Sequence, residues 1–275
     1  MRRILYFIAT NAAIMAVMSV ILLFLPAEFR TQNTTFLIFA LVAGFGGSIV
    51  SLLMSKSMAK RTTGLVMIEE PRNSTEQWLI DTVARQAKLA GIGMPEVGIF
   101  QTPQMNAFAT GANKNNALVA VSTGLLENMS REEAEAVMGH EIAHVANGDM
   151  ITLTLIQGVV NVFVLYMARA AAMALGRNNR LVYHAVFMGG QIFFGFLASL
   201  IVAFFSRQRE YRADTGGAKY ATKEGMIGAL EKLKMGQAGE LPKQLAAFGI
   251  NSGMKKFFST HPPLDERINA LRNQD

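Results

Sequence analysis

Residues Met138–Asp149 read Met-Gly-His-Glu-Ile-Ala-His-Val-Ala-Asn-Gly-Asp and contain the pattern H-E-x-x-H at His140, Glu141 and His144. Residues four apart on an α-helix lie one turn apart on the same face, so both imidazoles can bind one metal ion. A catalytic zinc ion commonly has three protein ligands and one water, and a glutamate beside that water acts as general base. The pattern therefore predicts a zinc site with Glu141 as the catalytic residue, and a third ligand remains to be found.

The residues around this pattern favour a helix. Ser130 and Glu133 have the spacing of a capping box, and Gly148 is a suitable residue to end the helix. Apolar residues recur at helical spacing, at Ala134, Val137, Met138, Ile142 and Val145. The alternative is a helix with two surface histidines and no metal, although the whole chain has only 4 His.

The composition is that of a membrane protein. Of the 275 residues, 51% are hydrophobic and only 17% are charged. The mean hydropathy is +0.27. The chain has no Cys, which excludes disulfides, thiolate ligands and a cysteine nucleophile. The net charge of +6 comes without a basic and aromatic pattern for nucleic acid, so we expect no nucleic-acid partner and attribute the charge to flanks of membrane segments.

Two apolar runs at the N-terminus predict a transmembrane hairpin in residues 1–55. The runs are Ile4–Leu25 and Thr35–Met54, and each is long enough to cross a bilayer. A signal peptide is the alternative for the first run, but its apolar core is about 7–15 residues long. Positive residues lie before the first run and after the second, so the positive-inside rule predicts that both flanks are cytoplasmic.

Two further apolar runs, Ile151–Leu175 and about Ala185–Phe205, form a second hydrophobic pair in residues 151–205. We expect a second transmembrane hairpin, and the alternative is burial in the protein or at the membrane interface. Arg177 and Arg180 in the predicted loop 176–184 mildly oppose an external location. An even number of crossings returns the chain to the cytoplasmic side.

The remaining segments, residues 56–150 and 206–275, have the character of a soluble domain in two parts. A helix is predicted from Asn73 toward Gly91. Short strands are predicted at Val97–Gln101, around Phe108 and at Ala117–Ser122, with a hairpin turn over residues 111–116. Helices are predicted at Lys223–Lys234 and Leu264–Arg272. The two parts must assemble into one domain against the membrane.

A second pair of residues four apart follows the fourth apolar run. Glu210 and Asp214 share one face of a predicted helix, so Glu210 can be the third zinc ligand and Asp214 can orient a ligand histidine through its free ring N–H. The alternative is an acidic pair on a solvated face that balances nearby arginines. The two motifs together favour the ligand interpretation.

The chain resembles the M48 family of zinc metalloproteases, and its bacterial inner-membrane members above all. The two motifs, the hairpin layout and three further stretches carry the resemblance: Asn106-Ala107-Phe108-Ala109-Thr110-Gly111, Gly148-Asp149 and Thr260-His261-Pro262-Pro263-Leu264. It implies an α-helical integral membrane protein with a gluzincin-like, mainly α (α+β) domain carrying a small β-sheet. It also implies one Zn²⁺ per chain and endopeptidase action on misfolded membrane proteins in quality control, at the cytoplasmic face of the bacterial inner membrane.

Substrate-binding residues are less clearly marked. By the resemblance, Asn106, Ala107 and Phe108 belong to a strand edge that binds extended peptide, although Phe108 can equally be ordinary core. His261 or Arg267 can stabilise the oxyanion, and His261 can instead cap a helix. His184 is expected to be structural, in a loop.

Three other functions fit parts of the sequence. A prenyl-protein (CaaX-type) protease belongs to a related branch but has a larger multi-span chamber. A divalent-metal transporter would carry its ligands at mid-membrane. A non-catalytic zinc-binding adaptor is the third, and the intact Glu141 argues against it. No feature of the sequence indicates an oligomeric state.

Overall fold

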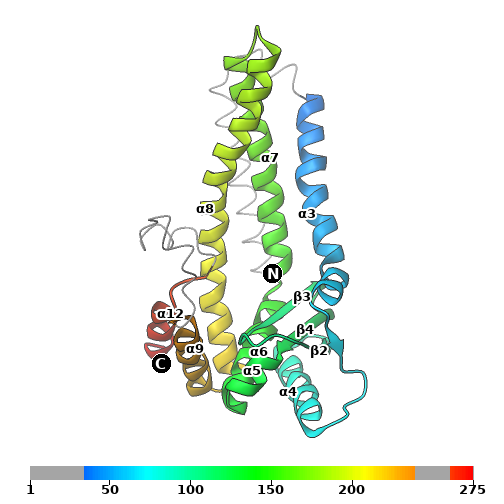
Figure 1. The fold of residues 1–275 in the computed structure, drawn as a ribbon, viewed down its shortest axis with the longest axis vertical. Helices are drawn as coiled ribbons and strands as arrows, with labels where there is room; N and C mark the ends of the chain where they lie inside the picture. Colours follow the sequence, from blue (N-terminus) through cyan, green and yellow to red (C-terminus); the bar gives the residue numbers. More distant parts are fainter. Residues whose placement is uncertain (1–33, 239–260, 275) are drawn as a thin grey trace. The chain divides into compact units, whose positions relative to one another are not determined.

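The computed structural model describes residues 34–238 and 261–274 and is mostly helical, with one small mixed sheet (Figure 1). This confirms the predicted fold class. The chain divides into two compact units, residues 1–51 with 152–202 and residues 52–151 with 203–275. In chain order the elements are α3 (Thr34–Thr62), β1 (Val66–Met67), α4 (Ser74–Ala90), β2 (Glu96–Phe100), β3 (Ala107–Asn113), β4 (Asn116–Ser122), α5 (Thr123–Asn128), α6 (Arg131–Asn147), α7 (Asp149–Leu175), α8 (Arg180–Tyr220), α9 (Lys223–Ala238) and α12 (Leu264–Arg272).

Three of these helices are long and apolar enough to cross a membrane. They are Ile38–Thr62 of α3, Asp149–Leu175 of α7 and Arg180–Tyr220 of α8. They contain the second, third and fourth apolar runs of the sequence. The first predicted run, Ile4–Leu25, lies outside the described residues.

Small and polar residues join α3 to α7 within the first unit. A Cβ on Gly44 would lie 2.7 Å from Cγ2 of Val162, so only glycine lets the two backbones approach this closely. Asn161 donates to the Gly44 carbonyl and to Oγ of Ser48, both at 3.4 Å. Interhelical hydrogen bonds from a side-chain amide stabilise helix pairs in a membrane, where no water competes for these groups.

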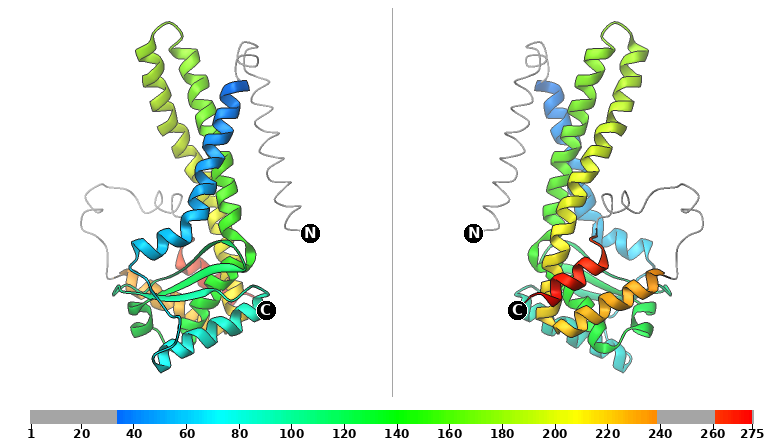
Figure 2. Two further views of the ribbon diagram at one scale, coloured as in Figure 1. Left: turned by 90° about the vertical axis from the view of Figure 1, so that its right-hand side faces the viewer. Right: turned by 90° about the vertical axis from the view of Figure 1, so that its left-hand side faces the viewer.

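The connection between α7 and α8 is shorter than predicted (Figure 2). Only residues 176–179 link the helices, because the Asn179 side chain accepts hydrogen bonds from the backbone N–H groups of Leu181 and Val182 and starts α8 there. The predicted loop over residues 176–184 is therefore wrong in length. His184 lies in α8, where its ring packs edge-on against Tyr183 at 5.6 Å.

The second unit contains a four-stranded sheet in the order β1-β2-β4-β3. Strands β2 and β4 are parallel, and the other two pairs are antiparallel. The three predicted strands are present, and the bounds of β2 and β4 differ from the predicted bounds by one residue. The turn between β3 and β4 is tighter than the predicted six residues, because β3 continues past Gly111, at φ 144°, with a register shift between Thr110 and Asn113. β3 forms one edge of the sheet.

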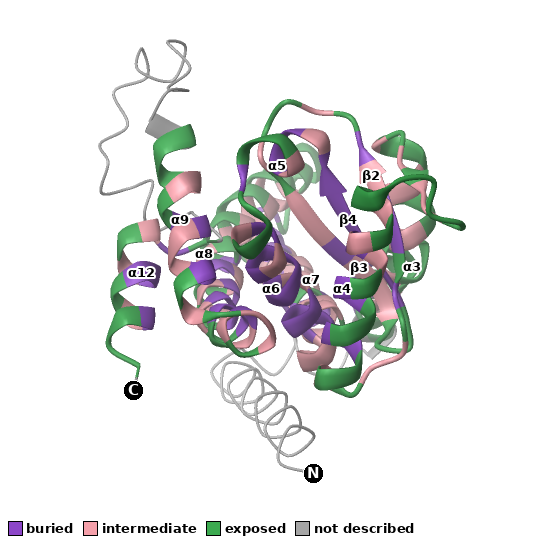
Figure 3. Ribbon diagram, turned by 90° about the horizontal axis from the view of Figure 1, so that it is seen from below, coloured by how far each residue is buried: buried purple, intermediate pink, exposed green. Residues whose placement is uncertain are grey.

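Helices α4 and α6 pack against this sheet, and α6 is buried along most of its length (Figure 3). Leu79 and Val83 of α4, Val119 of β4 and Met138 and Ile142 of α6 belong to one apolar core. A second core joins α6 to the C-terminal helices α9 and α12. Helix α6 thus lies at the centre of the second unit, where its buried side chains, His140 and His144 among them, are held rigidly.

Candidate metal centre and active site

Helix α6 begins and ends as its sequence predicts. Oγ of Ser130 accepts from the Glu133 backbone N–H, and the Glu133 carboxylate accepts from the Ser130 N–H. This is the predicted capping box. Gly148 ends the helix at φ 68°, a left-handed conformation that favours glycine. His140 and His144 lie one turn apart and are 7% and 6% exposed.

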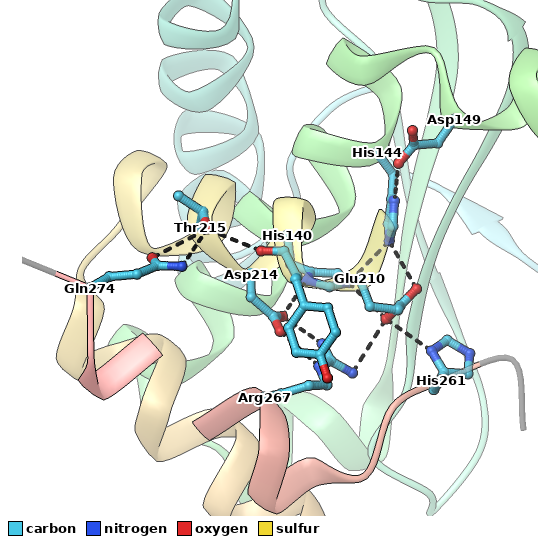
Figure 4. Close-up of polar contacts among 10 residues, drawn as sticks. His140, His144, Asp149, Glu210, Asp214, Thr215, His261, Arg267 and Gln274 are labelled. Carbon is cyan, nitrogen blue, oxygen red and sulfur yellow. Dashed lines mark hydrogen bonds and ion pairs between the residues drawn. The ribbon is translucent and has the colours of Figure 1, made fainter. Parts of the chain in front are cut away.

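Helix α8 places Glu210 opposite the two histidines (Figure 4). The two Nε2 atoms lie 3.1 Å apart. Oε1 of Glu210 lies 3.5 Å from Nε2 of His144, and Oε2 lies 3.7 Å from Nε2 of His140. Because α8 continues without a break to Tyr220, Glu210 and Asp214 do share one face of a helix.

These three donors fit a metal ion. Zinc bonds of about 2.0–2.1 Å in a tetrahedron separate neighbouring ligand atoms by about 3.3 Å, close to the 3.1–3.7 Å found here. Glu210 is 2% exposed, and its Oε2 accepts no hydrogen bond of normal geometry from the described residues. The contacts of this oxygen are ion pairs, with Nδ1 of His261 at 2.9 Å and Nη1 of Arg267 at 3.3 Å, and such a buried carboxylate is also suited to bind a metal cation. Two imidazoles and one carboxylate are the donor set of a catalytic zinc site.

Each histidine has a carboxylate behind it. Nδ1 of His144 donates to Oδ2 of Asp149 at 2.7 Å. Nδ1 of His140 lies 2.9 Å from Oδ1 of Asp214, at ion-pair distance but without normal hydrogen-bond geometry. Carboxylates in these positions fix the tautomer that leaves Nε2 for the metal. Asp214 was predicted in this role from its spacing to Glu210, whereas Asp149 was given no role, although it is an acidic residue just after the glycine that ends α6.

The charge around His144 favours its protonated form in the metal-free chain. Burial alone would lower its pKa, but the hydrogen bonds to Asp149 and Glu210 and the charge of Glu141 raise the pKa of His144 to about 9. A metal ion would therefore displace a proton from this histidine when it binds.

Arg267 of α12 connects the C-terminal helix to the site. Its Nε and Nη2 donate to the two oxygens of Asp214 at 2.8 and 2.5 Å, and Nη1 lies 3.3 Å from Oε2 of Glu210. Burial lowers the pKa of Arg267, but Asp214 and Glu210 more than offset this and keep the guanidinium charged. Arg267 is thus occupied by carboxylates and 7% exposed. His261, which is largely exposed, places Nδ1 2.9 Å from Oε2 of Glu210.

A cavity of about 130 Å³ lies beside His140 and Glu141. Asn106, Ala107, His261 and Arg267 line part of it. Much of the remaining wall is apolar and comes from Leu125, Met129, Val137, Met226, Leu230 and Leu233. Phe108 is not among the lining residues, and its ring lies 5.4 Å from that of Phe100.

A sequence model of peptidase family M48 matches residues 73–275. The chain belongs to peptidase family M48. The match confirms the resemblance seen in the sequence and assigns the chain to the metalloproteases, the class to which the His140, His144 and Glu210 group is suited.

Relatives of similar length support this assignment. Protease HtpX of Tolumonas auensis is 54% identical over 99% of both chains, and protease HtpX of Thioalkalivibrio sulfidiphilus is 55% identical, also over 99% of both. The M48 fold is shared with the crystal structure of S. mikatae Ste24p, with a TM-score of 0.65 and 19% identity over 98% of this chain. The chain spans 66% of the length of that structure's chain.

Together with the three apolar helices, these relatives indicate a bacterial membrane metalloprotease. They do not favour the CaaX-type protease, the metal transporter or the non-catalytic adaptor.

Proposed function

We propose that this M48 protein is a zinc-dependent endopeptidase that cleaves misfolded membrane proteins at the cytoplasmic face of the bacterial inner membrane. The observation that carries the proposal is the convergence of His140, His144 and Glu210 beside Glu141, next to a cavity whose wall is largely apolar. His140, His144 and Glu210 would hold one zinc ion. When bound, zinc supplies Lewis-acid polarisation of a carbonyl and activation of water.

Glu141 is the general base in this proposal. It lies next to His140 on α6, is only half-buried and lines the cavity, so it can meet both water and substrate. It takes a proton from the attacking water and passes it to the leaving amine. Asp149 and Asp214 keep His144 and His140 oriented during these steps.

The substrate backbone would lie along β3, the edge strand whose first residue is Ala107. An extended peptide can add to such an edge through main-chain hydrogen bonds. Asn106 and Ala107 are at the cavity, and the apolar wall suits an apolar side chain next to the scissile bond. Of the two candidates for oxyanion donor, we favour His261, because its side chain is largely exposed. The guanidinium of Arg267 is buried and holds both oxygens of Asp214.

The cytoplasmic location rests on charge. The second unit contains the site and also the membrane-flanking residues Lys56, Lys60 and Arg61. The positive-inside rule assigns such flanks to the cytoplasm. Lys56 and Lys60 both pair with Glu96 of β2, at 3.0 and 2.6 Å, so α3 ends against the sheet of this unit.

The proposal is tested by incubating the purified full-length chain, in detergent, with an unfolded membrane protein or casein. Wild-type protein should cleave, a chelator should stop cleavage and added zinc should restore it. Glu141→Gln should retain zinc and lose at least about a hundredfold in rate. Glu127→Gln is a matched control on α5 and should cleave normally. Chelator-insensitive cleavage, or a Glu141→Gln variant of normal rate, would overturn the proposal.

A further inference from the structure

Arg209 is a buried cation to which the reaction outlined above gives no role. It precedes Glu210 on α8 and is 6% exposed. Its Nη1 donates to the backbone carbonyl of Asp149 at 3.3 Å, and its Nη2 donates to Oγ of Ser206 at 3.1 Å. Its Nε is buried and makes no hydrogen bond to the described residues. Burying a guanidinium costs free energy, so its position requires an explanation.

The contacts of Arg209 complete a pattern that Arg267 begins. His140 is backed by Asp214, and Asp214 is held by Arg267. His144 is backed by Asp149, and the residue Asp149 is held through its backbone by Arg209. Each ligand histidine therefore has its own carboxylate, and each of these aspartates has its own buried arginine.

Charge alone does not explain Arg209. Four carboxylates surround the site, those of Glu141, Asp149, Glu210 and Asp214. The two guanidiniums and a divalent cation would balance them. A nearby cation nevertheless repels a metal ion, so Arg209 would weaken zinc binding if charge were its only effect.

The hydrogen bonds of Arg209 provide a second effect, which offsets this repulsion of the metal ion. Asp149 is the first residue of α7, directly after the left-handed turn at Gly148, so its side chain can face His144 only if this junction is fixed. Arg209 ties the junction to α8, the helix that carries Glu210. One side chain thus sets the position of Asp149 relative to the third ligand.

We propose that Arg209 is a positioning residue that holds the α6–α7 junction so that Asp149 orients His144 for zinc. This inference rests on the ligands assigned in the proposed function. Arg209 acts through Asp149 and touches neither substrate nor metal.

A double-mutant cycle on zinc affinity tests the proposal. The full-length chain in detergent is titrated with zinc against a competing chelator, and thermal unfolding of the metal-free chain is measured in parallel. Arg209→Lys keeps the charge and loses the forked geometry, so we expect zinc affinity to fall about tenfold. Ser206→Ala removes one of the hydrogen bonds that orient Arg209. It should also lower the zinc affinity, but by less than Arg209→Lys does. Arg212→Lys, the same change at an exposed position of α8, should have no effect.

The coupling distinguishes positioning from general structural support. In an Asp149→Asn background, Arg209→Lys should cost less than about threefold further, because the orientation it supports is already lost. In an Asp214→Asn background, Arg209→Lys should still lower the zinc affinity by its full factor of about ten. Unchanged zinc affinity, or an equal loss in both backgrounds, would overturn the inference. If the wild-type chain binds no zinc, both the proposed function and this inference are wrong. If wild type and Arg209→Lys bind zinc equally well, only this inference is wrong.

Discussion

Asp149 accepts a 2.7 Å hydrogen bond from Nδ1 of His144 across the junction of α6 and α7. The bond directs Nε2 of the same ring toward Nε2 of His140 and the Glu210 carboxylate. The orientation of the His144 ring thus depends on the first residue of a helix that has the length and composition of a membrane span.

Asp149→Asn should weaken zinc binding about 10- to 100-fold, because an amide can present its N–H to the ring and favour the wrong tautomer. Zinc competition with a chelator at fixed pH measures the change. Asp81→Asn, on the exposed face of α4, is the matched control and should bind zinc as wild type does. A normal affinity for Asp149→Asn would mean that the hydrogen bond does not position His144.

The metal-free chain should lose stability as pH rises from about 6.5 to about 9. The pKa of His144 is raised from 6.5 to about 9 in the folded chain, so the folded state binds a proton that the unfolded state has released in this range. The free energy of unfolding should fall by at most about 1.4 kcal/mol per pH unit from this group. Denaturant titrations at several pH values measure the slope, which should be smaller in Asp149→Asn. An unchanged slope in that variant would contradict the account.

Filling the apolar cavity should change cleavage preference. Leu233 of α9 lines the cavity that Glu141 also lines, and Leu233→Trp adds side-chain volume to its wall. We expect cleavage next to large apolar residues to fall about tenfold or more relative to cleavage next to alanine. Mass spectrometry of a digested peptide library measures the ratio. Leu89→Trp, at an exposed site on α4, should leave the preference unchanged, and an unaltered preference in Leu233→Trp would place the specificity elsewhere.

The α3–α7 contact predicts a contrast between two neighbouring glycines. Gly44→Val should lower the free energy of unfolding of the full-length chain in detergent by about 1–3 kcal/mol, because its Cβ would lie 2.7 Å from Cγ2 of Val162. Thermal melting of the two variants measures the change. A Cβ on Gly46 has no atom within 4 Å, so Gly46→Val is the control. Equal melting of the two variants would mean that this contact does not contribute to stability.

Local signals were sufficient to predict most of the elements. The capping box at Ser130 and Glu133 and the glycine at 148 define α6 through contacts within one turn, and these contacts are present. Spacing alone also predicted that Glu210 and Asp214 share one helix face, because residues four apart on a helix lie one turn apart. The predicted loop before α8 was too long because the cap from Asn179 was not recognised.

The groups that hold His140 and His144 from behind could not be predicted in the same way. Arg209 and Arg267 reach the site from α8 and α12, about 60 and 120 residues after the motif, and only tertiary packing brings them there. Arg267 was considered as an oxyanion donor because its sequence position says nothing of its bidentate contact with Asp214. Asp149 had a local signal, an acidic residue after the helix-ending glycine, and it was not given a role.

The most direct test of the central claim is the zinc content of the purified chain, measured by elemental analysis after exchange into metal-free buffer. The account predicts about one zinc per chain for wild type and for Glu141→Gln, and a loss of most of it in His144→Ala and in Glu210→Ala. A wild-type chain without zinc, or a Glu210→Ala variant that retains it, would contradict the assignment of this site.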